Sequence, residues 1–319
     1  MLSALFFILV GFVLLIVGAD YLVRGAVAIA NKLNIPSLIV GLTIVAFGTS
    51  TPEFVVSIKA ALSGSGGISV GNVVGSNIAN ILLILGTAGV ISSIACEKKS
   101  FLRDWGFMIF TTMLFVLFAL SGKFCLWHGL IMLALLIGFI VFNYINSKKS
   151  DEDASETKSP IADKNWFIVI AATLGGLVAI LYGSDLLVKG AVNLAKIFGI
   201  SEAIIGLTIV AVGTSMPELA TTVVAAIRKQ NGVALGNVVG SNIWNIVFII
   251  GATSTIVDIE VVRQILIYDM WVMVGATVVL LPIMMTQSKM NRIEGALFLL
   301  LYVGYITSQV LIAKGVWLF

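Results

Sequence analysis

The chain has 319 residues, of which 59% are hydrophobic and only 11% are charged, and its mean hydropathy is +1.11. This composition excludes a soluble globular protein, and a formal net charge of +3 indicates no nucleic-acid partner. The apolar residues fall into runs of about 20, the length that spans a bilayer core of roughly 30 Å. We therefore predict an all-α polytopic membrane protein surrounded by a lipid bilayer, with no obligate protein partner.

Ten membrane spans are predicted in chain order. They cover approximately residues 2–22, 37–61, 68–91, 105–120, 126–145, 166–188, 202–227, 233–257, 265–285 and 293–312. Between the fifth and the sixth span, the chain is polar and lacks apolar periodicity, which is typical of a solvated linker. The predicted organisation is a first five-helix repeat (1–146), a polar linker (147–164) and a second five-helix repeat (165–319).

The second half of the chain repeats the first at a displacement of 165 positions. Residues 18–27 match 183–192 at 7 of 10 positions, 41–57 match 206–222 at 11 of 17, and 71–86 match 236–251 at 12 of 16. Because five spans is an odd number, the second copy must enter the membrane with the opposite orientation. Inverted repeats are a transporter architecture, with the substrate held near the midplane where the repeats meet.

The distribution of basic residues predicts which side of the membrane each loop faces. If the N-terminus is outside, the inner loops hold 13 of the 19 lysines and arginines. By the positive-inside rule, this distribution favours an external N-terminus. The 147–164 linker is then cytoplasmic.

A carboxylate, hydroxyls and a helix break lie together in the second span and again in the seventh. The hexapeptide Gly48-Thr49-Ser50-Thr51-Pro52-Glu53 recurs as Gly213-Thr214-Ser215-Met216-Pro217-Glu218. Proline removes a backbone N–H and glycine lowers the cost of unwinding, so carbonyls such as that of Ala46 can leave the helix and point at an ion. Irregular backbone at membrane depth is tolerated only where protein or a wet cavity surrounds it.

The residue types indicate which ion would bind. Glu53 and Glu218 supply negative charge, and hydroxyl oxygens come from Thr49, Ser50, Thr214 and Ser215. An all-oxygen set suits a hard cation such as Ca²⁺ or Na⁺. The lack of thiolate or imidazole at these positions disfavours Zn²⁺ and Cu.

The third and eighth spans each carry a polar stripe, because positions four apart share one face of a helix. The stripe consists of Asn72, Ser76 and Asn80 in the first copy and of Asn237, Ser241 and Asn245 in the second. Alone, such a stripe is more typical of helix packing in membranes than of ion ligands. Beside two symmetric membrane glutamates, which are costly to keep without a function, we interpret it as completing the ligand shell.

Asp20 and Asp185 form a second symmetric pair of acids. They lie near the ends of their spans, beside Arg24 and Lys189. We expect structural or gating salt bridges at these positions and not ion ligands.

The two copies of Gly-Thr-Ser-x-Pro-Glu, each followed by Gly-Asn-Val-Val-Gly-Ser-Asn-Ile-x-Asn, resemble the alpha-repeats of the cation/Ca²⁺ antiporter superfamily. The prokaryotic sodium/calcium exchanger branch is the most similar, and the resemblance covers nearly the whole chain. It implies that Glu53 and Glu218 are the central Ca²⁺ ligands and that the first and sixth spans slide as a gating pair. It also implies flanking Na⁺ sites formed by Thr49, Ser50, Thr214, Ser215, Ser76 and Ser241 with the carbonyls of Ala46 and Ala211.

The chain departs from the superfamily's pattern at two places. Family members often carry an aspartate where this chain has Asn245, and its absence argues against K⁺ cotransport. The proton-coupled branch usually places a glutamate in the Gly-Asn motif, where this chain has Ser76 and Ser241. With two acids, one Ca²⁺ or two Na⁺ would neutralise the site, and a third Na⁺ would need carbonyl and amide dipoles.

On these grounds we predict a secondary active antiporter, not an enzyme, of the prokaryotic plasma (inner) membrane. It exchanges Ca²⁺ for Na⁺ by alternating access, with the ions bound at the repeat interface and no cofactor. An empty site would leave two carboxylates without a cation, which disfavours passage through the occluded state. A proton-coupled Ca²⁺/cation antiporter is the nearest alternative, because a desolvated membrane glutamate can carry protons. A passive cation channel would use the same oxygens without a counter-ion.

Overall fold

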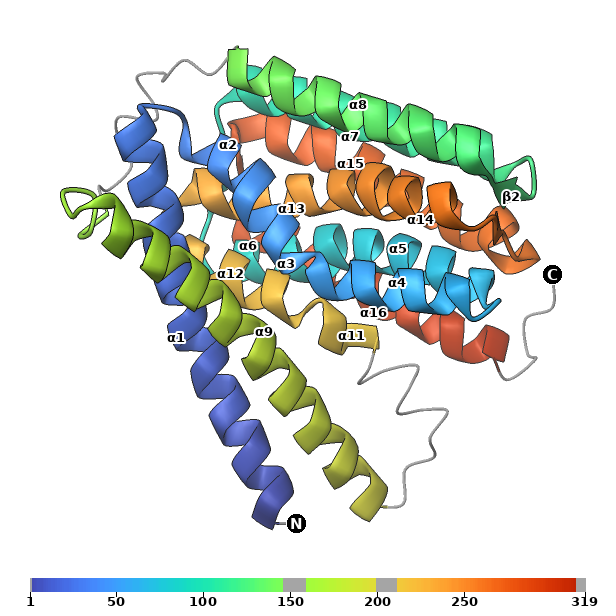
Figure 1. The fold of residues 1–319 in the computed structure, drawn as a ribbon, viewed down its shortest axis with the longest axis horizontal. Helices are drawn as coiled ribbons and strands as arrows, with labels where there is room; N and C mark the ends of the chain where they lie inside the picture. The colour runs from blue at the N-terminus through green and yellow to red at the C-terminus, as the bar shows by residue number, and fades with distance from the viewer. Residues whose placement is uncertain (1, 146–158, 199–210, 314–319) are drawn as a thin grey trace. The chain divides into compact units, whose positions relative to one another are not determined.

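The computed structural model describes residues 2–145, 159–198 and 211–313. Within them the regular secondary structure is helical except for four short strands (Figure 1). The first half comprises α1 (Leu2–Leu33), α2 (Ser37–Val40), the π-helical η1 (Gly41–Val45), α3 (Ala46–Thr49), α4 (Thr51–Leu62), α5 (Gly66–Ala79), the π-helical η2 (Asn80–Leu85), α6 (Gly86–Ile91), β1 (Ile94–Ala95), α7 (Lys98–Ala119), β2 (Lys123–Phe124) and α8 (Leu126–Ile145).

The second half of the chain has the same kinds of element. It comprises α9 (Trp166–Ile197), α11 (Ala211–Thr214), α12 (Met216–Ile227), α13 (Asn231–Trp244), the π-helical η5 (Asn245–Ile250), α14 (Gly251–Ile256), β3 (Ile259–Glu260), the π-helical η6 (Ile265–Asp269), α15 (Met270–Gln287), β4 (Lys289–Met290) and α16 (Arg292–Ala313). The predicted all-helical polytopic membrane fold is confirmed.

The predicted spans can be located in this element order. Among the described residues, eight helical segments are long and apolar enough to cross a membrane, and the bent pair Ser37–Thr49 and Thr51–Leu62 makes a ninth. The remaining predicted span, 202–227, lies partly outside the described residues, and its described part is α11 and α12. Most of the predicted 147–164 linker also lies outside them.

The helices α1 and α9 are longer than predicted, because each continues through charged residues at which the apolar pattern ends. In each helix an acid and a base four positions apart neutralise each other. Asp20 pairs with Arg24 at 2.8 Å, and Asp185 pairs with Lys189 at 2.6 Å. Pairs at this spacing stabilise a helix. The salt bridges predicted for the two aspartates are confirmed.

Local structure recurs at the same displacement as the sequence. The run α5, η2 and α6 precedes the run α13, η5 and α14 by 165 positions, and β1 precedes β3 by the same number. Both η2 and η5 begin at an asparagine, Asn80 in one and Asn245 in the other. The two sequence repeats therefore adopt the same local structures.

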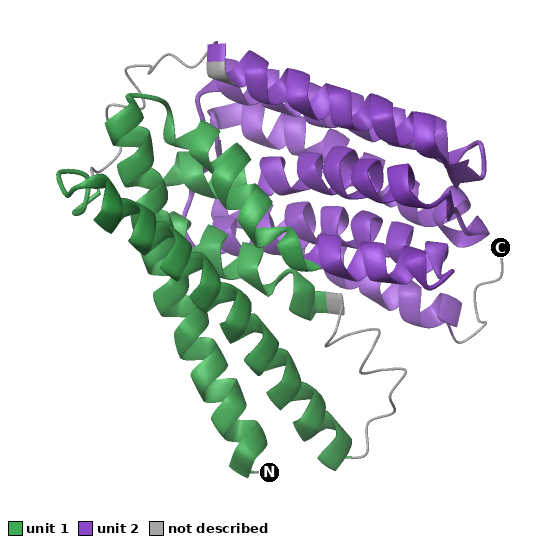
Figure 2. Cartoon of the chain, in the orientation of Figure 1, with its two compact units in different colours: residues 1–52, 147–237 green, residues 53–146, 238–319 purple. Residues whose placement is uncertain are grey.

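The chain forms two compact units (Figure 2). Unit 1 comprises residues 1–52 and 147–237, and unit 2 comprises residues 53–146 and 238–319. Each unit thus takes chain from both halves of the sequence, and the boundaries fall inside α4 and α13 and at the start of the linker.

In unit 1, α1 and α9 pack along each other through glycines (Figure 1). At each of these glycines, an added Cβ would lie less than 3.0 Å from an atom of the opposite helix. They are Gly11, Gly18 and Gly25 of α1, and Gly176, Gly183 and Gly190 of α9. A spacing of seven residues returns to nearly the same helix face after two turns, and small residues let membrane helices approach closely.

Unit 2 is also held together by close helix contacts at glycines. An added Cβ at Gly86 of α6 would lie 3.1 Å from the carbonyl oxygen of Gly295 in α16. An added Cβ at Gly129 of α8 would lie 2.6 Å from the carbonyl oxygen of Gly251 in α14. Gly251 follows Gly86 by 165 positions and Gly295 follows Gly129 by 166, so the two contacts are repeat equivalents.

Two antiparallel strand pairs join the loops of unit 2. β1 pairs with β4, placing Ile94 opposite Met290, and β2 pairs with β3, placing Phe124 opposite Ile259. An exposed ion pair between Lys123 and Asp258, at 2.6 Å, lies beside the second strand pair. The two pairs therefore connect loops that are far apart in the sequence.

Candidate cation site

The helix break predicted at the hexapeptide is present in both copies. Ser50 separates α3 from α4 with ψ of 5°, and Ser215 separates α11 from α12 with ψ of 6°. Pro52 and Pro217 follow in the first turn of α4 and of α12, where the missing N–H breaks no helical hydrogen bond. The break is narrow, because the Ala46 carbonyl still accepts the Ser50 N–H at 3.0 Å.

Glu218 lies in the first turn of α12, in unit 1, and its side chain is buried, at 1% exposure. Its Oε1 accepts a hydrogen bond from the Ser50 hydroxyl at 3.1 Å, and its Oε2 has no hydrogen-bond partner among the described residues. A buried carboxylate without a counter-charge is costly. An oxygen of this kind is suited to bind a cation.

Asn237, at the end of unit 1, joins several of these residues. Its Nδ2 donates to the main-chain oxygen of Glu218 at 3.3 Å and to the Thr222 hydroxyl at 2.9 Å. Its Oδ1 accepts from the Thr49 hydroxyl at 3.1 Å. The amide thereby fixes the turn that carries Glu218 and orients Thr49. Unit 1 thus brings together four of the predicted site residues, Thr49, Ser50, Glu218 and Asn237.

The same arrangement recurs in unit 2 at the equivalent positions. Asn72 Nδ2 donates to the main-chain oxygen of Glu53 at 3.1 Å and to the Ser57 hydroxyl at 3.0 Å. The Ser57 hydroxyl in turn donates to the main-chain oxygen of Ser69 at 3.4 Å. Glu53, like Glu218, is buried at 1% exposure. Each acid is therefore placed by an asparagine that holds its helical turn.

A cluster of asparagines lies in unit 2, where α5 and α13 end. Asn77 Nδ2 donates to the main-chain oxygen of Asn242 at 3.2 Å, and Asn245 Nδ2 donates to Asn77 Oδ1 at 3.0 Å. The amide oxygens of Asn80, Asn242 and Asn245 and the Ser241 hydroxyl are buried and have no hydrogen-bond partner within the described ranges. Buried polar atoms in proteins are normally satisfied, so these oxygens are also candidates for binding a cation.

The remaining predicted ligands are also placed on these elements. Ser76 is buried on α5 in unit 2, whereas Ser215 is buried and Thr214 half-buried in unit 1. Ala211 is the first residue of α11, directly after the undescribed segment. Among the described residues, no three His, Cys, Asp or Glu side chains gather as a metal cluster. Hydroxyl, amide and carbonyl oxygens would have to complete a cation site built on either glutamate.

Several polar residues of these networks were not predicted as site residues. They are Asn77 and Asn242, and the hydroxyl residues Ser57 and Thr222. Their signal in the sequence is the repeat itself, because each pair keeps an amide or a hydroxyl at a displacement of 165. The π-helical segments that begin at Asn80 and Asn245 were not predicted either, and such segments are frequent at functional sites.

Asp20 makes a further contact in unit 1 that its repeat equivalent Asp185 lacks among the described ion pairs. Besides Arg24 of its own helix, it pairs with Arg228, directly after α12. This carboxylate therefore ties α1 to the end of the helix that carries Glu218.

Comparisons with known proteins agree over nearly the whole chain. The family model described as sodium/calcium exchanger protein matches residues 3–145 and 168–311. Sodium/calcium exchanger MaX1 from Methanosarcina acetivorans is 33% identical over an alignment 340 residues long, gaps included. The alignment covers 94% of this chain and 96% of the relative. Inner membrane protein YrbG from Escherichia coli is 32% identical over 267 residues, which cover 82% of each chain. The solved structure of the sodium-calcium exchanger NCX_Mj, soaked with 2.5 mM Na⁺ and 0.1 mM Ca²⁺, has a TM-score of 0.81 and 32% identity and covers 96% of this chain and 98% of that one.

Proposed function

The chain belongs to the sodium/calcium exchanger protein family and is an antiporter of that type, and we propose that it exchanges Ca²⁺ for Na⁺ by alternating access. The observation that carries the proposal is the buried carboxylate of Glu218, whose Oε2 has no hydrogen-bond partner among the described residues. The relative MaX1 and the structural neighbour NCX_Mj are both named as exchangers of sodium and calcium.

In this proposal Glu53 and Glu218 are the Ca²⁺ ligands, and Na⁺ is held by the hydroxyl, amide and carbonyl oxygens around them. The duplicated asparagine contacts support this assignment, because Asn72 and Asn237 hold the turns of the two acids in the same way. The buried oxygens of Asn80, Ser241 and Asn245 support it as well. Neutral oxygen ligands of this kind suit a monovalent hard cation, which they would bind together with the two carboxylates.

The same charges explain why the two ions would be exchanged and not merely conducted. Moving an empty site through an occluded state would bury two carboxylates without a cation, which is costly. Either Ca²⁺ or Na⁺ removes that cost, so only an occupied site permits the helices to move. In cells, inward Na⁺ would drive Ca²⁺ export, since each charge is worth about 2.3 kcal/mol per 100 mV of membrane potential.

Uptake of ⁴⁵Ca²⁺ into proteoliposomes tests the proposed function. Vesicles are loaded with Na⁺, with K⁺ or with a proton gradient and no Na⁺. We expect uptake only from the Na⁺-loaded vesicles. Uptake driven by the proton gradient alone would assign the protein to the proton-coupled class. Uptake without any counter-ion would indicate a passive channel.

We also propose that the protein lies in the prokaryotic plasma membrane with its N-terminus outside and residues 147–164 in the cytoplasm. The basic residues support this orientation by the positive-inside rule, and the strand pairs of unit 2 support the alternation of the loops between the two sides. β1 and β4 both lie in loops that the positive-inside rule places inside, and β2 and β3 both lie in loops that it places outside. The name of YrbG, an inner membrane protein, supports the choice of membrane.

Cysteine labelling measures this orientation. In a variant in which Cys96 and Cys125 are replaced by serine, a new cysteine is introduced at one of two exposed loop positions, Asp258→Cys or Lys289→Cys. We expect a membrane-impermeant maleimide to label the first in intact cells and the second only after the membrane is opened. Labelling of only the Lys289→Cys variant in intact cells would show that the orientation is the reverse of the proposed one.

A further inference from the structure

A groove of about 500 Å³ lies between α7 and α8 of unit 2, and none of its lining residues belongs to the candidate cation site. A glycine on each helix opens it, since an added Cβ at Gly106 or at Gly138 would meet nothing within 4 Å. Phe107 and Phe139 line it, and their rings stack with centroids 4.2 Å apart. The volume lies in the range of small-molecule sites, roughly 300 to 1,000 Å³. Its walls suit an apolar chain.

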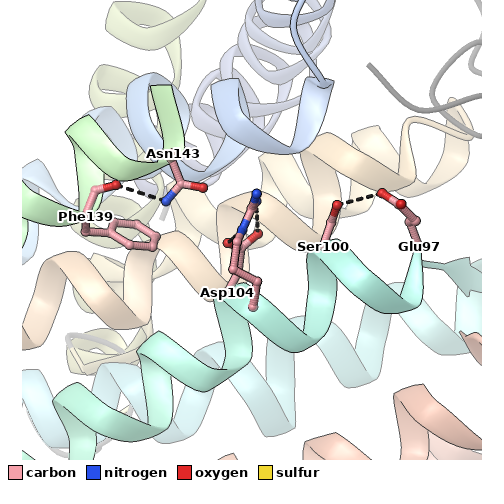
Figure 3. Close-up of polar contacts among 6 residues, drawn as sticks. Glu97, Ser100, Asp104, Phe139 and Asn143 are labelled. Atoms are coloured by element: carbon pink, nitrogen blue, oxygen red, sulfur yellow. Dashed lines mark hydrogen bonds and ion pairs between the residues drawn. The ribbon is translucent and has the colours of Figure 1, made fainter. Parts of the chain in front are cut away.

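One charged side chain lines this groove. Arg103, in the second turn of α7, donates from Nε to Asp104 Oδ1 at 2.8 Å and from Nη2 to Asp104 Oδ2 at 3.1 Å (Figure 3). Asp104 is buried at 1% exposure, so it fixes the plane of the guanidinium. Because Arg103 uses Nε and Nη2 for Asp104, its Nη1 can donate to another acceptor. Two exposed lysines, Lys98 and Lys99, begin the same helix.

The second repeat differs from the first at two positions of this groove. At a displacement of 165, Trp271 replaces Gly106 and Tyr268 replaces Arg103, whereas α16 follows α8 at a displacement of 166 and keeps Gly304 where α8 has Gly138. The Tyr268 hydroxyl donates to the Ser308 hydroxyl at 2.7 Å. Asp269, the equivalent of Asp104, accepts from Gln309 at 2.6 Å and from Tyr305 at 3.2 Å. The guanidinium and the opening at Gly106 are therefore particular to the first repeat and are not required by the fold.

We propose that the α7–α8 groove binds one anionic phospholipid. Its phosphate accepts hydrogen bonds from Arg103, and its acyl chain lies along the phenyl rings. A lipid fits because the groove joins an apolar wall to a basic end, and basic pockets between membrane helices bind anionic headgroups on the cytoplasmic side. That side is where the proposed orientation places the start of α7.

Native mass spectrometry of the delipidated protein in detergent tests the site. The probes are phosphatidylglycerol and phosphatidylcholine with identical acyl chains, and inorganic phosphate. We expect one phosphatidylglycerol to bind at least about tenfold more tightly than phosphatidylcholine, because charge-assisted hydrogen bonds are the stronger kind. Inorganic phosphate should neither bind nor displace the lipid.

Two variants and a control locate the binding. Arg103→Gln should remove the preference between the two lipids, and Gly106→Trp, which places the second repeat's side chain in the groove, should weaken both by about tenfold or more. Gly106→Trp leaves the Arg103–Asp104 pair intact, so it is informative even if Arg103→Gln does not fold. The control Arg292→Gln removes a basic residue at the start of α16 and should change nothing. Equal binding of the two lipids, unchanged binding in Gly106→Trp, or competition by inorganic phosphate would each overturn the proposal.

Discussion

Glu218→Gln should lower Na⁺-dependent Ca²⁺ uptake by a factor on the order of 100 or more, equivalent to about 2.8 kcal/mol. Glutamine keeps the shape of the side chain and an oxygen that can accept the Ser50 hydroxyl, which lies 3.1 Å from Glu218 Oε1. It removes only the charge. In a buried site that charge supplies most of the attraction for a divalent cation. The initial rate of ⁴⁵Ca²⁺ uptake into Na⁺-loaded proteoliposomes measures the effect.

The control for this substitution is Asp258→Asn, which makes the same chemical change at an exposed carboxylate. Asp258 pairs with Lys123 in a loop of unit 2 and has 51% of its side chain exposed. We expect its uptake to match the unmodified protein. The Glu218 variant should also keep its thermal stability, because removing a buried charge that has no counter-charge does not destabilise a fold. Near-normal uptake in Glu218→Gln would exclude this acid as a Ca²⁺ ligand.

The repeat extends this prediction to the other acid. Glu53→Gln should lose uptake to a similar extent, because Asn72 holds the turn of Glu53 as Asn237 holds the turn of Glu218. A loss in only one of the two variants would show that the two glutamates have different roles. That outcome would remove the argument from symmetry while leaving the other acid as a ligand.

Apolar run length and the internal repeat were sufficient to predict most of the fold. The fifth predicted span, 126–145, coincides with α8, and the helix break after Gly48 was predicted from the adjacent proline. The C-terminal end of α1 was not predicted, because an ion pair within the helix lets it continue past Asp20 where hydropathy falls. The π-helical segments were missed for a related reason, since their hydrogen-bond pattern leaves no mark in the apolar periodicity.

The candidate site could be predicted as a set of residue types but not as a set of contacts. Ser50 and Glu218 belong to different repeats, and only the folded chain shows that one donates to the other. The stripe of Asn72, Ser76 and Asn80 was predicted as one surface of ligands. In the structure Asn72 holds the backbone of Glu53, whereas the amide of Asn80 has no hydrogen-bond partner among the described residues. Equal spacing therefore did not distinguish a positioning residue from a candidate ligand.

The second large effect is expected at the glycine contact between α1 and α9. An added Cβ at Gly176 would lie 2.5 Å from the backbone nitrogen of Leu22 and 2.7 Å from the carbonyl oxygen of Gly18. Backbone atoms cannot rotate away as a side chain can, so the two helices would have to separate. We expect Gly176→Val to lower the free energy of unfolding by about 3 kcal/mol, the upper end for overpacking. The apparent Tm, measured by size-exclusion chromatography after heating, should fall accordingly.

The neighbouring residue offers a matched control. Gly175 lies on the same helix, and an added Cβ there would meet nothing within 4 Å. Gly175→Val therefore makes the same change in helix propensity and side-chain volume without the contact, and should keep its Tm and its Ca²⁺ uptake. Gly176→Val should also exchange more slowly, because α1 and α9, the proposed gating pair, must stay in contact to move together. Equal stability and exchange in the two variants would show that this close contact holds neither the fold nor the gate.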